Sequence, residues 1–168
     1  DRAYRVATEL RERGGTTIGV MADVSNRFQC VHLIETTRNE WGRIDILINC
    51  AAIQPSASIL KMDEWELMRV FDVNMKGPFF MSQLVGRVMS DRHEVDGTRG
   101  LMITLAAAEP EQVGLAAYAA TQAALPAFVR ACAREYAPLG IGVHLLPIAG
   151  KPEQTAATAM ALIAEQLG

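Results

Sequence analysis

The stretch IDILINC, residues 44–50, is short, apolar and rich in isoleucine, which is typical of a β-strand buried on both faces of a sheet. Three other stretches share this character, and segments with apolar residues at helical spacing separate them. Apolar strands that alternate with helices predict an open, doubly wound α/β fold with a parallel sheet covered on both faces. The expected strands are 16–22, 44–50, 101–106 and 141–147, and the expected helices are 1–13, 23–41, 63–91, 116–137 and 152–167.

Local signals predict where several helices end or bend. Gly14 follows the first helical segment as a terminator, and Ser25 or Asn26 is available to cap the second. Gly77 and Pro78 interrupt the pattern of the long third helix, so a bend is expected near 74–78.

The composition is that of an ordinary globular protein. A chain of 168 residues with 50% apolar and 21% charged residues suits one domain over 1–168. The net charge of -3 gives no basic surface, so nucleic acid is not an expected partner. The longest apolar run, 115–129, is too short and too polar for a membrane span. The cysteines Cys30, Cys50 and Cys132 and the three histidines lack metal or disulfide spacing, which favours a reduced, cytoplasmic protein without a metal.

The segment YAATQ, residues 118–122, places two polar side chains on one helical face. Tyr118 and Gln122 are four residues apart, so they are neighbours on a helix surface. A lysine at position 122 would attract the tyrosinate form of Tyr118, whereas a neutral amide offers only a hydrogen bond. We therefore expect a phenol with no activating charge.

Six short segments follow one another at a recognisable spacing: ADVS (22–25), INCAA (48–52), FDVNMKGPFFMSQ (71–83), GLMITLAAA (100–108), YAATQAAL (118–125) and GIGVHLLPIAG (140–150). Together they resemble the short-chain dehydrogenases/reductases over nearly the whole chain. This resemblance implies a Rossmann-like, three-layer α/β/α fold. It also implies an ancestral transfer of hydride between NAD or NADP and an alcohol or carbonyl substrate.

In that family a tyrosine exchanges a proton with the substrate oxygen, assisted by a lysine, a serine and an asparagine. The resemblance assigns the tyrosine role to Tyr118 and the asparagine role to Asn74. Gln122 stands at the lysine position, and Ala107, or else Ala106, stands at the serine position. The residues that the resemblance assigns to the cofactor are Asp23, Val24, Asn49, Ala51 and Pro147.

Structural interpretations of the same residues remain open. Tyr118 could pack on an alanine-rich helix, and Asn74 could stabilise the bend before Gly77. Asp23 could cap the following helix. Asn49 could simply end a strand.

Two classes of function follow from these assignments. The first is a hydride-transfer enzyme with impaired turnover, in which carbonyl reduction suffers less than alcohol oxidation because reduction needs a neutral phenol as acid. The second is a non-catalytic scaffold or binding subunit that keeps the fold for assembly. An enzyme of other chemistry that uses Tyr118 as an acid is a third hypothesis. The resemblance also implies a homodimer or homotetramer formed through 76–90 and 116–136.

The ends of the chain differ from the family pattern. A dinucleotide site needs a glycine-rich turn between a strand and a helix, whereas Gly14 and Gly15 follow a helix and precede a strand. The family strand order would separate 16–22 from 44–50 by a gap. We therefore expect the domain to be truncated at both ends and to lack its first βαβ unit. Direct pairing of these two strands is the alternative.

Overall fold

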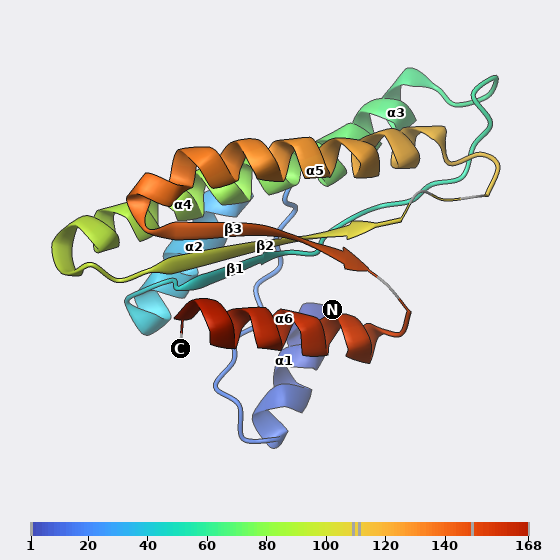
Figure 1. The fold of residues 1–168 in the computed structure, drawn as a ribbon. Helices are drawn as coiled ribbons and strands as arrows, with labels where there is room; N and C mark the ends of the chain where they lie inside the picture. Colours follow the sequence, from blue (N-terminus) through green and yellow to red (C-terminus); the bar gives the residue numbers. More distant parts are fainter. Residues whose placement is uncertain (1, 109, 111, 149, 168) are drawn as a thin grey trace.

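The structure, a computed structural model, describes residues 2–108, 110, 112–148 and 150–167. Three parallel strands form a sheet in the order β1-β2-β3, with helices on both faces (Figure 1). The predicted α/β class and three-layer, Rossmann-like arrangement are confirmed. The elements are α1 (Arg2–Glu12), α2 (Arg27–Trp41), β1 (Ile46–Asn49), α3 (Glu64–Phe71), the π-helix η1 (Asp72–Lys76), α4 (Gly77–Asp96), β2 (Gly100–Ala107), α5 (Ala116–Tyr136), the 3₁₀-helix η2 (Ala137–Leu139), β3 (Ile141–Ile148) and α6 (Pro152–Leu167).

The central strand β2 divides the apolar core into two layers. Alternate side chains of a strand point to opposite faces, so Met102 joins one layer while Leu101 and Ile103 join the other. All three are fully buried. The first layer lies under α2, α4 and α5, and the second lies under α6. Burial of a side chain of this size contributes roughly 1.5–3 kcal/mol.

Helix ends follow local capping chemistry. Asn26, one of the two predicted caps, accepts hydrogen bonds from the backbone N–H groups of Phe28 and Gln29, so α2 begins at Arg27 rather than at 23. The predicted end of the long helix at 91 is wrong, because α4 continues to Asp96. Gly97 ends it in the left-handed conformation and donates its N–H to the His93 carbonyl.

The predicted interruption near 74–78 is a wide helical turn. Residues 72–76 form one π-helical turn between α3 and α4. Pro78 then lies in the first turn of α4, where its missing N–H has no intrahelical role. Such π turns are frequent at functional sites.

The expected strand at 16–22 is wrong, because this segment is extended but pairs with no strand of the sheet in the described structure. It packs instead against α1, where the Thr17 hydroxyl donates to the Ala7 carbonyl at 2.8 Å. A Cβ at Gly19 would lie 2.8 Å from the Ala3 carbonyl oxygen, so only glycine permits this approach. The alternative of direct pairing with β1 is also not what the structure has. An apolar sequence makes a strand only where another edge is within hydrogen-bonding reach.

A cavity of about 770 Å³ lies beside residues 17–22, where the expected strand does not form. It is bounded by α1, by residues 17–22, and by Cys50 and Ala51 just after β1. The edge of β1 that faces away from β2 therefore has no neighbouring strand among the described residues.

Candidate active site at the carboxyl edge of the sheet

The parallel register gathers the candidate residues at one edge. Asn49 pairs with Thr104, and further along the strands Ala106 pairs with Pro147. All three strands point their carboxyl ends to this edge, which is where open α/β sheets bind ligands. The loops that follow β1 and β2 meet above it, since the Ala57 N–H donates to the Gly114 carbonyl at 3.0 Å.

Asn74 is placed by the π turn and is almost completely buried, with 1% of its surface exposed. Its side-chain oxygen accepts the Ile53 N–H at 2.9 Å, and its amide nitrogen donates to the Ile53 carbonyl at 3.0 Å. The Asn74 side chain thus bonds both backbone groups of Ile53, a residue of the loop after β1, as the backbone of a neighbouring strand would. This contact gives Asn74 a structural role at the site.

Thr121 is a site residue that sequence reasoning missed. Its fully buried hydroxyl accepts a hydrogen bond from the Asn74 amide at 3.1 Å and donates to the Tyr118 carbonyl at 2.7 Å. Asn74 is therefore linked to the backbone of Tyr118 through one hydroxyl. The signal available in the sequence was a hydroxyl residue within the helical segment YAATQ.

Tyr118 lies in the first turn of α5 and is half-buried. Burial raises the pKa of its phenol above the ordinary value, and among the described residues no charged group counteracts that shift. The predicted absence of an activating charge is thus consistent with the described surroundings. The phenol stays protonated at neutral pH, so it can donate a proton but is a poor base.

Gln122 contacts the end of β2. Its side-chain oxygen accepts the Ala107 N–H at 2.8 Å, and the residue is only 6% exposed. Strand β2 ends at Ala107, one residue beyond the predicted end. Ala106 therefore lies within the strand, and its side chain is buried. The structure thus brings the predicted lysine-position and serine-position residues into direct contact.

Asn49 is a buried polar residue beneath the edge. Its amide nitrogen donates to the hydroxyls of Ser82 and Thr104, both at 3.3 Å. These two hydroxyls are buried as well and were not singled out from the sequence. The side chain therefore ties β1 to β2 and to α4.

Asp23 forms an ion pair rather than a helix cap. Its carboxylate accepts from the Arg69 guanidinium at 2.9 Å and from the Ser25 N–H and hydroxyl at 2.9 and 2.7 Å. Burial alone would raise the pKa of Asp23, but the Ser25 and Arg69 contacts outweigh it and lower that pKa. Since Asn26 is the cap, the capping interpretation of Asp23 is wrong. The pair instead joins the start of the α2 region to α3.

Three of the residues assigned to the cofactor line one small cavity. Val24, Asn49 and Ala51 border a space of about 170 Å³ beside the open edge of β1. A Cβ at Gly77 would lie 2.7 Å from a methyl group of Val24, so glycine allows α4 to approach this wall closely. Pro147 is exposed on β3, outside this cavity, and Asp23 is not among its lining residues.

A nicotinamide dinucleotide fits these residues only in part. Exposed Ala51 follows β1, and exposed Pro147 lies near the carboxyl end of β3, so both are at the edge where open α/β sheets bind ligands. Gly14 follows α1, as expected, but the segment that it precedes is not a strand. Across the described ranges, no glycine-rich turn leads from a strand of this sheet into a helix, so these residues offer no holder for the pyrophosphate.

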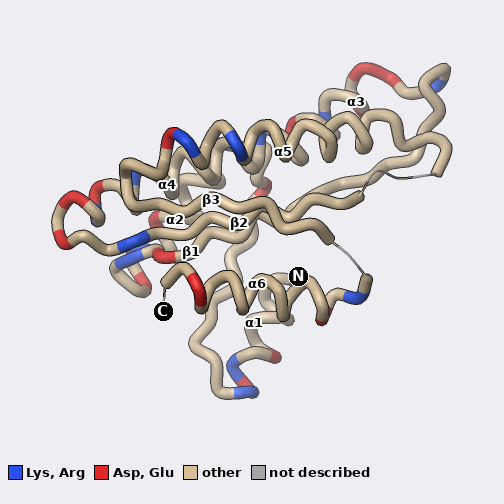
Figure 2. The backbone as a smooth tube through the Cα atoms, in the orientation of Figure 1, with Lys and Arg blue, Asp and Glu red and all other residues tan. Residues whose placement is uncertain are grey.

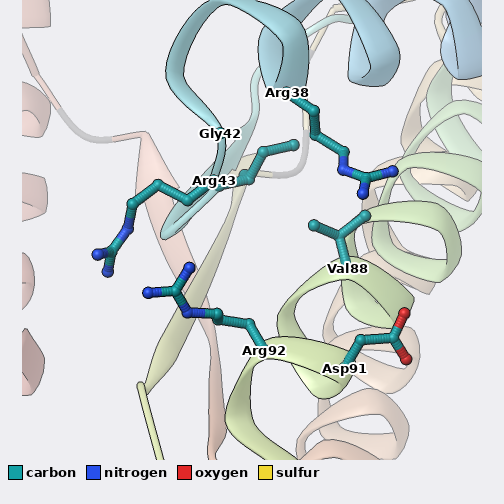
Figure 3. A pocket seen from close by; sticks show the side chains of 7 residues that line it. Arg38, Gly42, Arg43, Val88, Asp91 and Arg92 are labelled. Atoms are coloured by element: carbon teal, nitrogen blue, oxygen red, sulfur yellow. The ribbon is translucent and has the colours of Figure 1, made fainter. Parts of the chain in front are cut away.

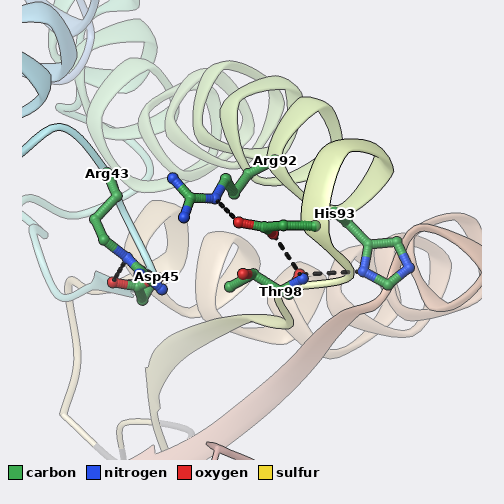
Figure 4. A network of polar contacts seen from close by, with 6 residues as sticks. Arg43, Asp45, Arg92, His93 and Thr98 are labelled. Carbon is green, nitrogen blue, oxygen red and sulfur yellow. Dashed lines mark hydrogen bonds and ion pairs between the residues drawn. The ribbon is translucent and has the colours of Figure 1, made fainter.

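A separate cavity of about 200 Å³ lies near the amino-terminal end of the sheet, between the ends of α2 and α4. Arg38, Arg43 and Arg92 line it together with Asp91 (Figure 3). Arg43 pairs with Asp45 at 2.6 Å, and Arg92 pairs with Asp96 in the adjoining network (Figure 4). Hydrogen bonds from Thr98 lower the pKa of Asp96 to about 2, and the Arg92 charge adds to this. The arginines are thus balanced by carboxylates, and the cavity is remote from the carboxyl edge.

The basic residues do not gather on one face of the structure (Figure 2). Basic residues lie among acidic ones along the backbone rather than on one face (Figure 2). Within the described part of the chain, no helix combines the length and apolarity that crossing a bilayer needs. The same residues contain no group of three or more His, Cys, Asp or Glu side chains arranged to hold a metal ion.

Comparison with known proteins decides the family. The profile described as short chain dehydrogenase matches residues 1–160. The chain belongs to the short-chain dehydrogenase family. Glucose and ribitol dehydrogenase homolog 2 from Arabidopsis thaliana is 34% identical over 145 residues, which are 86% of this chain and 48% of that protein. The 3-oxoacyl-[acyl-carrier-protein] reductase from Synechocystis sp. is 32% identical over 142 residues, which are 84% of this chain and 56% of that protein.

A solved structure has a similar fold. Gluconate 5-dehydrogenase from Burkholderia cenocepacia, in complex with NADP and tartrate, superposes with a TM-score of 0.77 at 27% identity. The superposition covers 87% of this chain and 56% of that one. The chain spans about half the length of the curated relatives it matches.

Proposed function

We propose that this chain belongs to a protein that reduces a carbonyl group with a nicotinamide cofactor, NADH or NADPH. The observation that carries the proposal is Tyr118, a half-buried phenol whose pKa is raised by burial and is not lowered by any charged group in the described part of the chain. Reduction requires a proton donor at the developing alkoxide, and a neutral phenol already has the proton. Oxidation requires the phenolate, which burial disfavours here.

The residues of the chain have the following roles in the proposed reduction. A reduced nicotinamide, when bound, would supply a hydride for the carbonyl carbon. Tyr118 gives its phenolic proton to the carbonyl oxygen, and solvent returns a proton to the phenol. Asn74 and Thr121 hold the Tyr118 turn through the two hydrogen bonds described above. The residues Asp23, Val24, Asn49, Ala51 and Pro147 keep their assignment as the cofactor-facing set.

Turnover is expected to be slow. Ala107 offers no hydroxyl to the substrate oxygen, and loss of one preorganised donor at an oxyanion typically lowers the rate by about 10²–10³. Gln122 supplies no positive charge to the cofactor ribose or the phenol. The family tetrad is therefore reduced to Asn74 and Tyr118.

Substrate class and assembly follow from the family. Small carbonyl compounds or alcohols are the proposed substrates, and the names of the relatives include a sugar-alcohol dehydrogenase homologue and a 3-oxoacyl reductase. Exposed Phe79 on α4 and exposed alanines on α5, such as Ala123 and Ala127, support assembly into a homodimer or homotetramer. The proposed location is the cytoplasm.

A scaffold or binding subunit is the second candidate. The observation that favours it is the engagement of Gln122, whose side-chain oxygen is bonded to Ala107. A side chain bonded in this way stabilises the fold whether or not chemistry occurs.

Cofactor titration separates the two candidates. The natural protein that contains this chain is titrated with NADH and NADPH while tryptophan fluorescence and thermal unfolding are followed. Ligand binding to the folded state raises the unfolding temperature, and the rise grows with the logarithm of the ligand concentration once that exceeds the Kd. Binding accompanied by oxidation of NAD(P)H in the presence of small ketones supports the reductase. Binding without turnover, or no binding at up to 1 mM, an upper limit on the order of weak ligand affinities, favours the scaffold.

A further inference from the structure

Gln122 makes a contact that a lysine could not make. The Ala107 N–H is a donor at the last residue of β2, and the Gln122 side-chain oxygen accepts it at 2.8 Å. An ammonium group has three donors and no acceptor, so it would face the Ala107 N–H without a bond. Leaving a sheltered backbone N–H without an acceptor is unfavourable.

This contact is one of two that hold consecutive residues of α5. Thr121 is bonded to Asn74 of the π turn, and Gln122 is bonded to Ala107 of β2. Tyr118 precedes them by one turn of the same helix, and its carbonyl accepts the Thr121 hydroxyl. The position of the phenol relative to the end of β2 is therefore fixed from two separate elements.

The burial of Gln122 indicates that its polar side-chain atoms need hydrogen-bond partners within the protein. Only 6% of the residue is exposed, and buried glutamine side chains need their polar atoms bonded. Its partner Ala107 stands at the position where the family resemblance expects the substrate-orienting serine. The hydrogen bond thus fixes the main chain at the end of β2, where the resemblance places the substrate-orienting residue.

We infer that Gln122 is a positioning residue, which fixes the end of β2 beside the Tyr118 turn by accepting a hydrogen bond rather than by supplying charge. The inference deepens the proposed reductase function and rests on it for its kinetic part. It reverses the simplest expectation from the family pattern, since Gln122→Lys should harm the site rather than restore it.

Two substitutions separate geometry from charge. Gln122→Glu keeps an acceptor of the same length and adds a negative charge, whereas Gln122→Lys removes the acceptor and adds a positive charge. If hydrogen-bond acceptance by residue 122 determines activity, kcat/KM of Gln122→Lys falls at least about tenfold below that of Gln122→Glu, a difference equal to roughly 1.4 kcal/mol. If a positive charge matters instead, Gln122→Lys has the higher kcat/KM of the two variants, and that outcome overturns the inference.

A third variant separates positioning from stability. Gln122→Met has nearly the same shape without the acceptor. We expect kcat per mole of folded protein, with the folded fraction measured by circular dichroism, to fall at least about tenfold while the KM for cofactor stays within about twofold; dividing by the folded fraction removes the effect of a general loss of folded protein. An unchanged kcat in a folded Gln122→Met protein overturns the inference.

A measurement on the unaltered protein needs neither turnover nor a stable variant. Long-range NMR experiments detect scalar coupling across a hydrogen bond, here between the Ala107 amide nitrogen and the Gln122 side-chain carbonyl carbon. We expect this coupling, together with exchange of the Ala107 amide proton at least about 100-fold slower than that of exposed amides. Missing coupling with rapid exchange overturns the inference. If no ketone is reduced while the coupling is present, the reductase proposal fails and Gln122 is only a structural acceptor, so the positioning role is overturned as well.

Discussion

Asn74 donates its side-chain amide to the Thr121 hydroxyl at 3.1 Å and thereby connects the π turn before α4 to the first turns of α5. Both side chains are buried, and Asn74 also exchanges two hydrogen bonds with the backbone of Ile53. Three segments that are far apart in the chain thus meet at one amide. Tyr118, the proposed proton donor, is attached to this junction, because its carbonyl accepts a hydrogen bond from the Thr121 hydroxyl.

Removing the Asn74 amide should destabilise the whole fold. Asn74→Ala leaves the Ile53 N–H and carbonyl and the Thr121 hydroxyl without this partner, and each buried group without a partner costs about 1–3 kcal/mol. We expect the free energy of unfolding to fall by about 2–4 kcal/mol, measured by urea denaturation. Asn39→Ala, at an exposed position in α2, is the control and should change stability by less than about 0.5 kcal/mol. A loss below about 1 kcal/mol for Asn74→Ala would contradict the junction described here.

Removing the Tyr118 hydroxyl should lower the rate of carbonyl reduction without lowering the stability of the fold. Tyr118→Phe should lower carbonyl reduction at least about 100-fold while cofactor affinity and the unfolding temperature stay nearly constant. Steady-state oxidation of NAD(P)H measures the first quantity, and fluorescence titration measures the second. Tyr4→Phe, on the exposed side of α1, is the matched control and should leave all three unchanged.

The pH profile of the wild-type protein follows from the same phenol. Tyr118 acts as an acid only while protonated, and burial raises its pKa above the ordinary value of roughly 10. The rate of reduction should therefore stay constant through neutral pH and fall only as the pH rises through that pKa. An alkaline limb that begins below pH 9, about one unit under the unperturbed phenol, would indicate a cation that activates the tyrosine.

The alternation of apolar strands and helices made the architecture predictable, since periodicity reports which faces are buried. The helix ends were harder, because α4 runs past the polar segment after Asp91 until Gly97 stops it. The segment 16–22 has the composition of a strand, but pairing depends on a neighbouring edge that local sequence does not encode.

The candidate site was predictable where helical spacing decides proximity. Tyr118 and Gln122 share a face of α5 as their separation of four residues requires. The partners of the other site residues were missed because they are distant in sequence: Arg69 is 46 residues from Asp23, and Thr104 is 55 residues from Asn49. Only the folded sheet brings such pairs together.

A methyl group at Gly77 should be tolerated only after space is made for it. The added Cβ would lie 2.7 Å from a methyl group of Val24, which is closer than unbonded carbons approach. We expect Gly77→Ala to lower the free energy of unfolding by about 1–3 kcal/mol, by urea denaturation. Val24→Ala removes that methyl group, so the double variant should recover more stability than the two single changes predict together. Additive effects would show that α4 and Val24 do not touch.

Breaking the Asp23–Arg69 pair should produce a small, pH-dependent loss of stability. Both side chains are 37% exposed, so Arg69→Met should lower the free energy of unfolding at pH 7 by about 1 kcal/mol or less. The folded-state pKa of Asp23 is lowered, so its stabilising effect is present above the unfolded value of roughly 3.9 and is lost as the pH falls through the folded value. The difference between variant and wild type should therefore shrink below pH 4, and about 1 M NaCl should reduce it at pH 7. Arg5→Met, which removes an exposed pair with Glu9, is the control. A difference that stays constant from pH 7 to pH 2, a range spanning both sides of the unperturbed carboxyl pKa of roughly 3.9, would show that Arg69 stabilises the fold by packing rather than through Asp23.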